Sequence, residues 1–243
     1  IAFGINIDSQ VNVLKKYFDK IKIKKTLLLW PDSEFTEQSK SIEEKDILKF
    51  YRTYSYDTNP KKITAEIEKI TKYRERKKDL ERRIKILEKS DLYKHQQELK
   101  KLEQMHTLGE VNFDSVFIID FGERLKSVLT SFMFSDVSNK KVNFFTINQW
   151  FDETLFNENA MQNLHFPSID LDNLKKFNKK FSNKFNEEPN KVSILAYDAL
   201  GLIYYCWFNN NFQFQKDQLY SNEGFKGLHG EFFIKNNQSL QKL

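Results

Sequence analysis

The stretch FDSVFIID, Phe113–Asp120, decides the fold of this chain. Its apolar core is short and rich in β-branched and aromatic residues, a composition typical of a buried strand. The segment in front of it, from Tyr73 to Gly109, is long, highly charged and helical in pattern, and it stops at the glycine. The sequence therefore predicts a core strand that directly follows a largely solvated helical insertion.

The chain around this stretch alternates predicted strands with predicted helices. A first helix, which Asp8 or Ser9 can cap, ends at Lys22. The remaining elements are strands at 26–30, 48–56, 113–119 and 142–146, and helices at 35–45 and 123–134. Strand, helix and strand at this spacing indicate βαβ units, so we expect an α/β lobe with a doubly wound parallel sheet.

The charged segment between the second and third strands has its own pattern. Asn59-Pro60 opens it, and Ser90-Asp91 can cap a second helix within it. The apolar stripes on both sides of that cap are narrow, which favours a helical hairpin over 59–106; one continuous helix is the alternative. From Asn59 to Gln104 there are fifteen Lys and Arg against nine Asp and Glu. This surplus of six exceeds the net charge of +5, so the rest of the chain is close to neutral.

The hairpin has two functional interpretations, a partner-docking arm or a plain solvated insertion. Nucleic-acid binding is disfavoured, because acidic residues are interleaved with the basic ones and no aromatic stacking pattern is present. The hairpin charge therefore says nothing about a substrate.

The last third of the chain carries two further helices. After an irregular stretch that ends near Pro167, helices are expected at 171–185 and 192–208. The second is apolar nearly all round, which predicts burial. The single cysteine, Cys206, lies in it as a small buried residue. Phe225–Lys235 reads as a turn into a final strand.

No motif of known chemistry is present. The sequence has no glycine-rich nucleotide loop, no nucleophile elbow and no zinc-protease motif. His95, His106, His165 and His229 are scattered, without metal-ligand spacing. We therefore expect no enzymatic activity, no cofactor and no metal. No apolar run is long enough to span a bilayer.

In an open α/β sheet, ligands bind outside the carboxyl ends of the strands. Here those ends lead into 30–33, 120–124 and 147–150, which are rich in aromatic, carboxylate and amide groups. The alternative is that these are ordinary loops, with Asp120 as a helix cap and with Trp30 and Trp150 packing between the lobes. The predicted rim of a ligand cleft consists of Trp30, Asp32, Phe35, Asp120, Phe121, Glu123, Gln149 and Trp150.

Several stretches together resemble one superfamily. They are FDSVFIID followed by FGERL, Trp150 followed by FDETL, NLHFPSID, FNKKFSNKFNEEPNKVSILAYDALGLIYY, and GFKGLHGEFFIKNNQSL. Their order is similar to that of the type 1 periplasmic binding proteins, the leucine-binding-protein-like fold. The insertion, with YRERKKDLERRI and LEQMHTLGEVNFDSV, resembles the alphaproteobacterial penicillin-binding protein activators within that superfamily.

This resemblance implies a two-lobed protein whose first segment lies upstream of Ile1. Residues 1–166 would form the second lobe, with the hairpin insertion at 59–106. Residues 167–222 would form a partial first lobe, and 223–243 would return to the second. Phe35-Thr36 stands where solute binders carry a cleft-lining aromatic residue followed by glycine, which is why Phe35 belongs to the predicted rim.

The implied function is that of an extracytoplasmic, non-enzymatic lipoprotein of the periplasm or cell envelope, which regulates peptidoglycan synthesis by docking on a cell-wall synthase. The alternative is the substrate-binding protein of an amino-acid or amide ABC transporter, which would dock on a permease. A third, more distant interpretation is a cytoplasmic sensor lobe fused to a DNA-binding domain. A small polar ligand is expected, nucleic acid is not, and the membrane is reached only through an upstream anchor.

Overall fold

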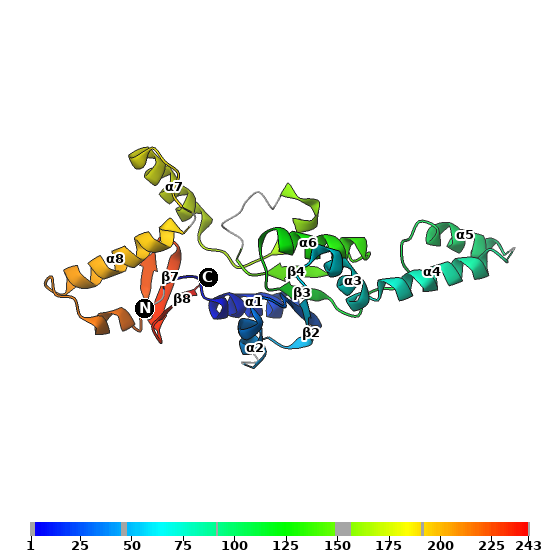
Figure 1. Cartoon of the computed structure of the whole chain (residues 1–243), viewed down its shortest axis with the longest axis horizontal. Coiled ribbons are helices and arrows are strands. Elements are labelled where there is room, and N and C mark those ends of the chain that lie inside the picture. The colour runs from blue at the N-terminus through cyan, green and yellow to red at the C-terminus, as the bar shows by residue number, and fades with distance from the viewer. Residues whose placement is uncertain (1–2, 45–47, 91, 149–156, 191, 243) are drawn as a thin grey trace.

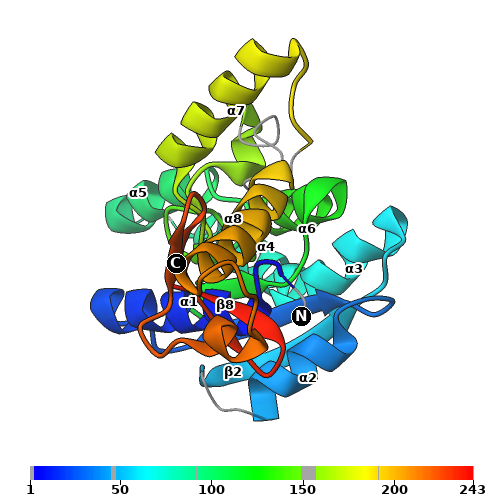
Figure 2. The same ribbon diagram turned by 90° about the vertical axis from the view of Figure 1, so that its left-hand side faces the viewer.

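The computed structural model describes residues 3–44, 48–90, 92–148, 157–190 and 192–242. Figure 1 shows an elongated molecule in three parts: a helical arm, a central lobe of sheet and helices, and a group of helices with a small sheet. The arm and the small sheet lie at opposite ends of the long axis. Figure 2, turned by 90°, looks along this axis from the small-sheet end.

The central sheet is parallel, with strand order β2-β1-β3-β4-β5. Its strands are β1 (Thr26–Pro31), β2 (Phe50–Tyr56), β3 (Ser115–Ile118), β4 (Asn143–Thr146) and β5 (Leu164–His165). Every residue of β1 and β3 is buried, as expected for central strands covered on both faces. The α/β fold with a parallel sheet is thereby confirmed, while β5 comes from the stretch predicted to be irregular.

Two pairs of helices cover the sheet. Helices α1 (Ile7–Ile21) and α2 (Thr36–Glu44) pack on one face, and α3 (Pro60–Ile70) and α6 (Gly122–Phe134) pack on the other. Alternate residues of β1 divide between these two cores. Leu27 and Leu29 face α3 and α6, whereas Leu28 faces α1 and α2. The two-sided burial explains why β1 and β3 are continuous apolar runs in the sequence, whereas the edge strand β2 alternates.

The helix starts partly follow the predicted caps. Asn59 caps α3 through its side-chain oxygen, which accepts from the Lys61 amide at 3.0 Å. The predicted caps of α1 were wrong, because Asn6 takes this position and accepts from the Asp8 amide at 2.7 Å. Ser9 is buried inside the helix instead, and its hydroxyl accepts from the Gln241 amide at 3.1 Å.

The arm consists of α4 (Tyr73–Leu87) and α5 (Tyr93–Leu102), which pack against each other. Their shared core contains Leu80, Leu87, Leu99 and Leu102. A hairpin rather than one continuous helix is therefore confirmed. Its bounds need correction, because Ile63 and Ile67 of α3 face the sheet core and the arm begins only at Tyr73.

The turn of the arm also differs from the prediction. Ser90 caps no helix; its hydroxyl lies 2.7 Å from His95 Nδ1, and α5 follows Leu92 without a side-chain cap. Asp91, the other predicted cap, lies outside the described residues.

The opposite end of the molecule combines α7 (Leu171–Phe185) and α8 (Ser193–Asn209) with a three-stranded antiparallel sheet. One final strand was predicted, whereas the structure has three, in the order β6-β7-β8. They are β6 (Phe225–Gly227), β7 (Gly230–Lys235) and β8 (Gln238–Lys242). Short 3-10 turns occupy Asn159–Met161 and Lys216–Tyr220.

A buried carboxylate joins α8 to this sheet. Asp198 accepts from the backbone amides of Leu228 at 2.9 Å and His229 at 2.8 Å, and it contacts His229 Nδ1. Burial raises the pKa of Asp198, but the hydrogen bonds from His229 and the two amides outweigh it, so the net pKa is lowered. The turn between β6 and β7 is thus fastened to the helix.

The prediction that α8 is buried all round was wrong. One side, with Leu202 and Cys206, packs on the small sheet, so the expected burial of the cysteine is confirmed. The other side exposes large apolar residues, including Leu200 at 69% and Tyr204 at 59%. No described element of the chain covers that face.

Candidate functional site

The strand order reverses between β1 and β3. The chain leaves β1 for β2 on one side and returns to β3 on the other. The loops after the carboxyl ends of these two strands therefore diverge, and ligands of open α/β sheets bind in the crevice between such loops. Residues 32–35 and 119–123 form these loops and hold the candidate site.

Asp120 is the buried centre of this site, with no exposed surface. Its Oδ2 accepts from the Tyr56 hydroxyl at 2.5 Å. Its Oδ1 accepts from the Phe121 amide at 2.8 Å and from Arg124 Nε and Nη2 at 3.2 and 3.1 Å. A carboxylate without water needs such donors, and these hydrogen bonds explain how Asp120 stays buried.

Arg124 joins the buried carboxylate to the rim. The residue lies in the first turns of α6, and its guanidinium holds Glu34 in a two-pronged pair, at 2.9 Å from Nη1 and 2.8 Å from Nη2. This fork geometry is the strongest form of ion pair available to a carboxylate. Glu34 follows β1, so the pair closes the switch point from one loop to the other.

The electrostatics of the three linked groups follow from this geometry. The hydrogen bond from Arg124 lowers the pKa of Glu34, and the hydrogen bond to Glu34 raises the pKa of Arg124. Burial, together with the neighbouring Asp120 carboxylate, raises the pKa of Tyr56 far above its usual value. The hydroxyl therefore keeps its proton and remains a donor.

Two aromatic rings complete the rim. Phe35 and Phe121 meet edge to face with ring centroids 5.9 Å apart, and the Arg124 guanidinium carbon lies 5.8 Å from the Phe121 ring centre. Phe35 adopts a left-handed backbone with φ of 59°. The arrangement offers flat apolar surface beside one cation that two carboxylates already neutralise. It can position an aromatic or amphipathic ligand, but it provides no activated nucleophile.

The eight predicted rim residues have different fates. Asp120, Phe121 and Phe35 come together as described. Trp30 is buried in the core between the sheet and helices α1 and α2, and not on the rim. Asp32 and Glu123 are exposed and stand outside the network. Gln149 and Trp150 lie outside the described residues.

Three residues of the network were not singled out from the sequence. Arg124 falls within a predicted rim loop, and its spacing of four from Asp120 on a helix start was a usable signal. Glu34 and Tyr56 gave no comparable signal. Their roles depend on two other chain segments reaching the same point in space.

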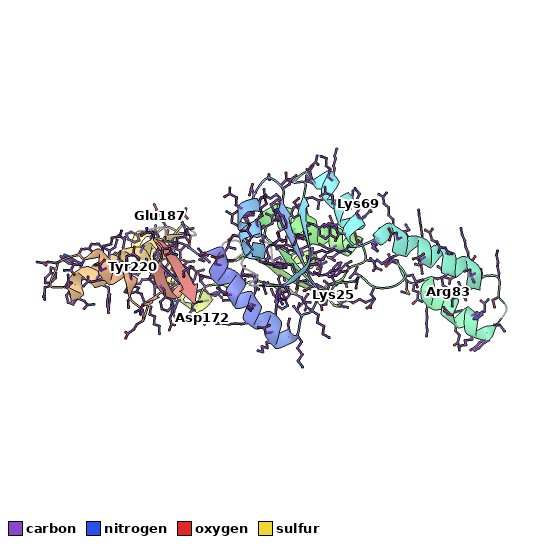
Figure 3. The ribbon with its side chains drawn as sticks, turned by 90° about the horizontal axis from the view of Figure 1, so that it is seen from below. Lys25, Lys69, Arg83, Asp172, Glu187 and Tyr220 are labelled. Carbon is purple, nitrogen blue, oxygen red and sulfur yellow. The ribbon has the colours of Figure 1, made fainter. Side chains whose placement is uncertain are left out.

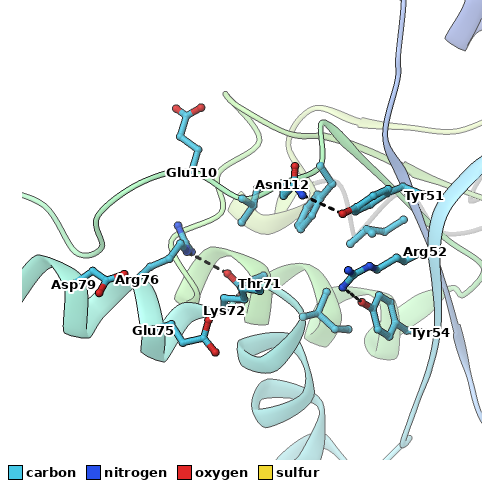
Figure 4. Close-up of a pocket in the computed structure, with 14 residues that line it drawn as sticks. Tyr51, Arg52, Tyr54, Thr71, Lys72, Glu75, Arg76, Asp79, Glu110 and Asn112 are labelled. Carbon is cyan, nitrogen blue, oxygen red and sulfur yellow. Dashed lines mark hydrogen bonds between the residues drawn. The ribbon is translucent and has the colours of Figure 1, made fainter.

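A second hollow lies at the base of the arm, beside the amino ends of β2 and β3 (Figure 4). Its volume is about 360 Å³. Tyr51 and Tyr54 line it together with Arg52, which donates to the Tyr54 hydroxyl at 3.5 Å. Asn112 donates to the Tyr51 hydroxyl at 3.0 Å, so the tyrosine wall is held in place.

The described residues contain no group of three or more His, Cys, Asp or Glu side chains arranged to hold a metal ion. Among the helices of the described ranges, none has the length and apolarity to cross a membrane.

Comparison with known proteins gives the fold but no closer family. No family model matches the chain, and no protein in a search of curated sequences matches it. Solved structures do match. A branched-chain amino acid ABC transporter periplasmic ligand-binding protein from Burkholderia xenovorans LB400 aligns with a TM-score of 0.63 at 11% identity, over 98% of this chain and 57% of that one.

Two other matches are similar in extent. An ABC transporter substrate-binding protein from Desulfitobacterium hafniense, complexed with Leu, has a TM-score of 0.54 at 14% identity, over 96% of this chain and 60% of that one. The LpoA C-domain from Haemophilus influenzae, described as a regulator of PBP1A, has a TM-score of 0.53 at 10% identity, over 96% of this chain and 62% of that one.

The fold is that of the type 1 periplasmic binding proteins. The chain spans about three fifths of the length of the solved structures it matches. The structures named above are described as ligand-binding or regulatory proteins, and at 10–14% identity the likeness shows the fold alone.

Proposed function

We propose that this chain belongs to an extracytoplasmic, non-enzymatic protein that regulates peptidoglycan synthesis by docking on a cell-wall synthase. The observation that carries the proposal is the arm. It is inserted between β2 and β3, projects away from the lobe and leaves the switch-point site untouched (Figure 1). A ligand carrier has no evident use for such a projection, whereas a docking protein does. The likeness to the LpoA C-domain supports the proposal at the level of the fold.

The chemistry of the site adds support. Arg124 is already paired with Asp120 and Glu34, so the described part of the site presents no free cation for the carboxylate of an amino acid. A free amino acid would have to displace Glu34 first. The site is better suited to holding two loops together than to capturing a small zwitterion.

The test compares full-length protein with a variant whose arm is shortened. Replacement of residues 81–98 by a short glycine-containing turn keeps Leu80 and Leu99, which share one core, and leaves Arg76 in place. We expect this variant to lose binding to the synthase and stimulation of its activity. Unchanged binding and stimulation would contradict the docking role. A Lys175→Gln variant on α7 serves as a control outside the arm.

The alternative is a substrate-binding protein of an amino-acid or amide ABC transporter. The paired rings of Phe35 and Phe121 at the switch point favour it, because they offer an apolar wall for a ligand. Here saturating ligand, at about a hundredfold over Kd, adds about 2.7 kcal/mol of stability. A shift of several degrees in Tm with one amino acid or amide, retained in the arm-shortened variant, would support the transporter role.

A further inference from the structure

The far end of the arm presents exposed apolar side chains. Ile86 in the last turn of α4 is 55% exposed, and Leu92 and Tyr93 at the start of α5 are 63% and 78% exposed. The interior of the arm is filled by other residues, the leucines of its shared core. These three side chains therefore contribute little to the fold of the arm, and exposing them has a cost that needs another explanation.

Three lysines without an ion pair neighbour these side chains in the sequence. Arg82 and Arg83 are each engaged by an acid, at 3.3 Å from Asp79 and 2.8 Å from Glu98. Lys85, Lys89 and Lys94 are exposed, and within the described ranges none of them forms an ion pair. We call the three lysines together with Ile86, Leu92 and Tyr93 the arm tip. Within residues 85–94 the three lysines stand against Glu88 and Asp91, so this end of the arm carries a net charge of +1.

The arm is fixed to the lobe at its other end. Arg76 is 8% exposed and donates to the carbonyls of Thr71 at 3.1 Å and Ser135 at 2.6 Å, and to the Thr107 hydroxyl at 3.0 Å. Ser135 ends α6, a helix of the sheet core. The tip is therefore held at a set distance and direction from the lobe. Figure 3 shows the arm from a second side and labels Arg83, the α4 residue that pairs with Glu98 of α5.

We propose that the arm tip contacts an anionic lipid surface, with Leu92, Tyr93 and Ile86 entering the headgroup region and the three lysines pairing with lipid phosphates. A protein partner fits less well. A specific protein interface buries roughly 800 Å² per partner and is depleted in lysine. Three of the six arm-tip residues are lysines, which does not suit a protein interface. Aliphatic, tyrosine and lysine side chains together are typical of the bilayer interface.

This contact uses the tip alone and does not depend on any ligand at the switch point. The proposed docking on a synthase would use the sides of α4 and α5, so the tip variants below should keep the synthase binding that the shortened arm loses. The tip contact would orient the lobe relative to the bilayer. A surface-bound arm would place the switch-point loops at a defined height above the membrane.

The test is co-sedimentation of the full chain with vesicles. One set contains phosphatidylcholine alone, and the other contains equal parts of phosphatidylcholine and phosphatidylglycerol. We expect binding to the anionic set only, weakened by high salt. Each lysine near an anionic surface contributes a similar share of the binding free energy. Changing all three tip lysines to Gln should therefore weaken binding on the order of a hundredfold. Leu92→Ser with Tyr93→Ser should abolish the vesicle binding that remains at high salt.

Two controls separate the tip from other surfaces. Phe134→Ser removes an equally exposed apolar side chain at the end of α6 and should leave binding unchanged. The triple variant Lys175→Gln, Lys176→Gln and Lys179→Gln removes three lysines of α7 and should also leave vesicle binding nearly unchanged. The proposal is overturned if the tip variants bind as well as the parent, or if the α7 variant loses binding instead. It is also overturned if the tip variants change the oligomeric state in gel filtration, because a second copy would then cover the tip.

Discussion

Arg76 gives the sharpest prediction about the energetics of this fold. Its guanidinium makes four hydrogen bonds: to the carbonyls of Thr71, Gly109 and Ser135, at 3.1, 3.4 and 2.6 Å, and to the Thr107 hydroxyl at 3.0 Å. Thr107 in turn donates to Asp136 at 2.6 Å. Burial lowers the pKa of Arg76, as it does for any cation removed from water.

The perturbation is Arg76→Met, which keeps much of the side-chain volume and removes every donor. A buried acceptor that loses its donor costs about 1–3 kcal/mol, and the guanidinium engages four acceptors. Removal of the desolvated charge returns part of this cost. We therefore expect the free energy of unfolding to fall by about 3 kcal/mol, a large effect for one residue.

The assay is urea unfolding followed by circular dichroism, together with amide hydrogen exchange resolved by segment. Exchange in α4 and α5 should rise more than exchange in β1 and β3, because the arm loses its attachment before the sheet opens. The control is Arg74→Met. Arg74 pairs with Glu68 at 2.8 Å, but its side chain is 78% exposed, so its loss should cost less than about 1 kcal/mol.

A free energy of unfolding for Arg76→Met within about 0.5 kcal/mol of the parent value would refute the reasoning, since surface substitutions change it by that little. Equal exchange rates in the arms of parent and variant would show that other contacts fix the arm.

Three further predictions concern the sheet lobe and the small sheet. Tyr56 has a raised pKa in the folded state, so stability should fall above about pH 10, by at most about 1.4 kcal/mol per pH unit; Tyr56→Phe should remove this slope in alkaline unfolding titrations. Gly227→Ala would place its methyl carbon 2.7 Å from Asp198 Cγ and should lower Tm by several degrees in calorimetry. An unchanged Tm would contradict this prediction and show that the turn can shift. The exposed apolar face of α8 should make the chain self-associate, and Leu200→Ser with Tyr204→Ser should reduce this association in sedimentation velocity; unchanged association would place the contact elsewhere.

The central strands β1 and β3 were predictable because their residues are buried on both faces. Leu27–Leu29 and Val116–Ile119 are apolar without interruption, a pattern typical of strands in a covered parallel sheet. Asn59-Pro60 likewise fixed the start of α3 through local capping chemistry.

The errors lie where burial depends on distant segments. The face of α8 around Leu200 is as apolar as its inner face, so the sequence could not tell which side is covered. The strand β8 is polar in sequence, and its pairing with β7 is visible only in the fold. The stripe of Ile63 and Ile67 continued toward the arm in sequence, yet it packs on the sheet.

The sequence by itself determined the α/β class, the order of the central strands along the chain, the hairpin insertion and the position of Asp120 at a strand end. These features arise from local periodicity and capping, which neighbouring residues carry. Tertiary structure alone decided the strand order in the sheet, the meeting of Tyr56, Glu34 and Arg124 around Asp120, and the attachment of the arm through Arg76. Each of these depends on groups from separate segments meeting in space, and hydrogen-bond geometry of this kind leaves no period in the chain.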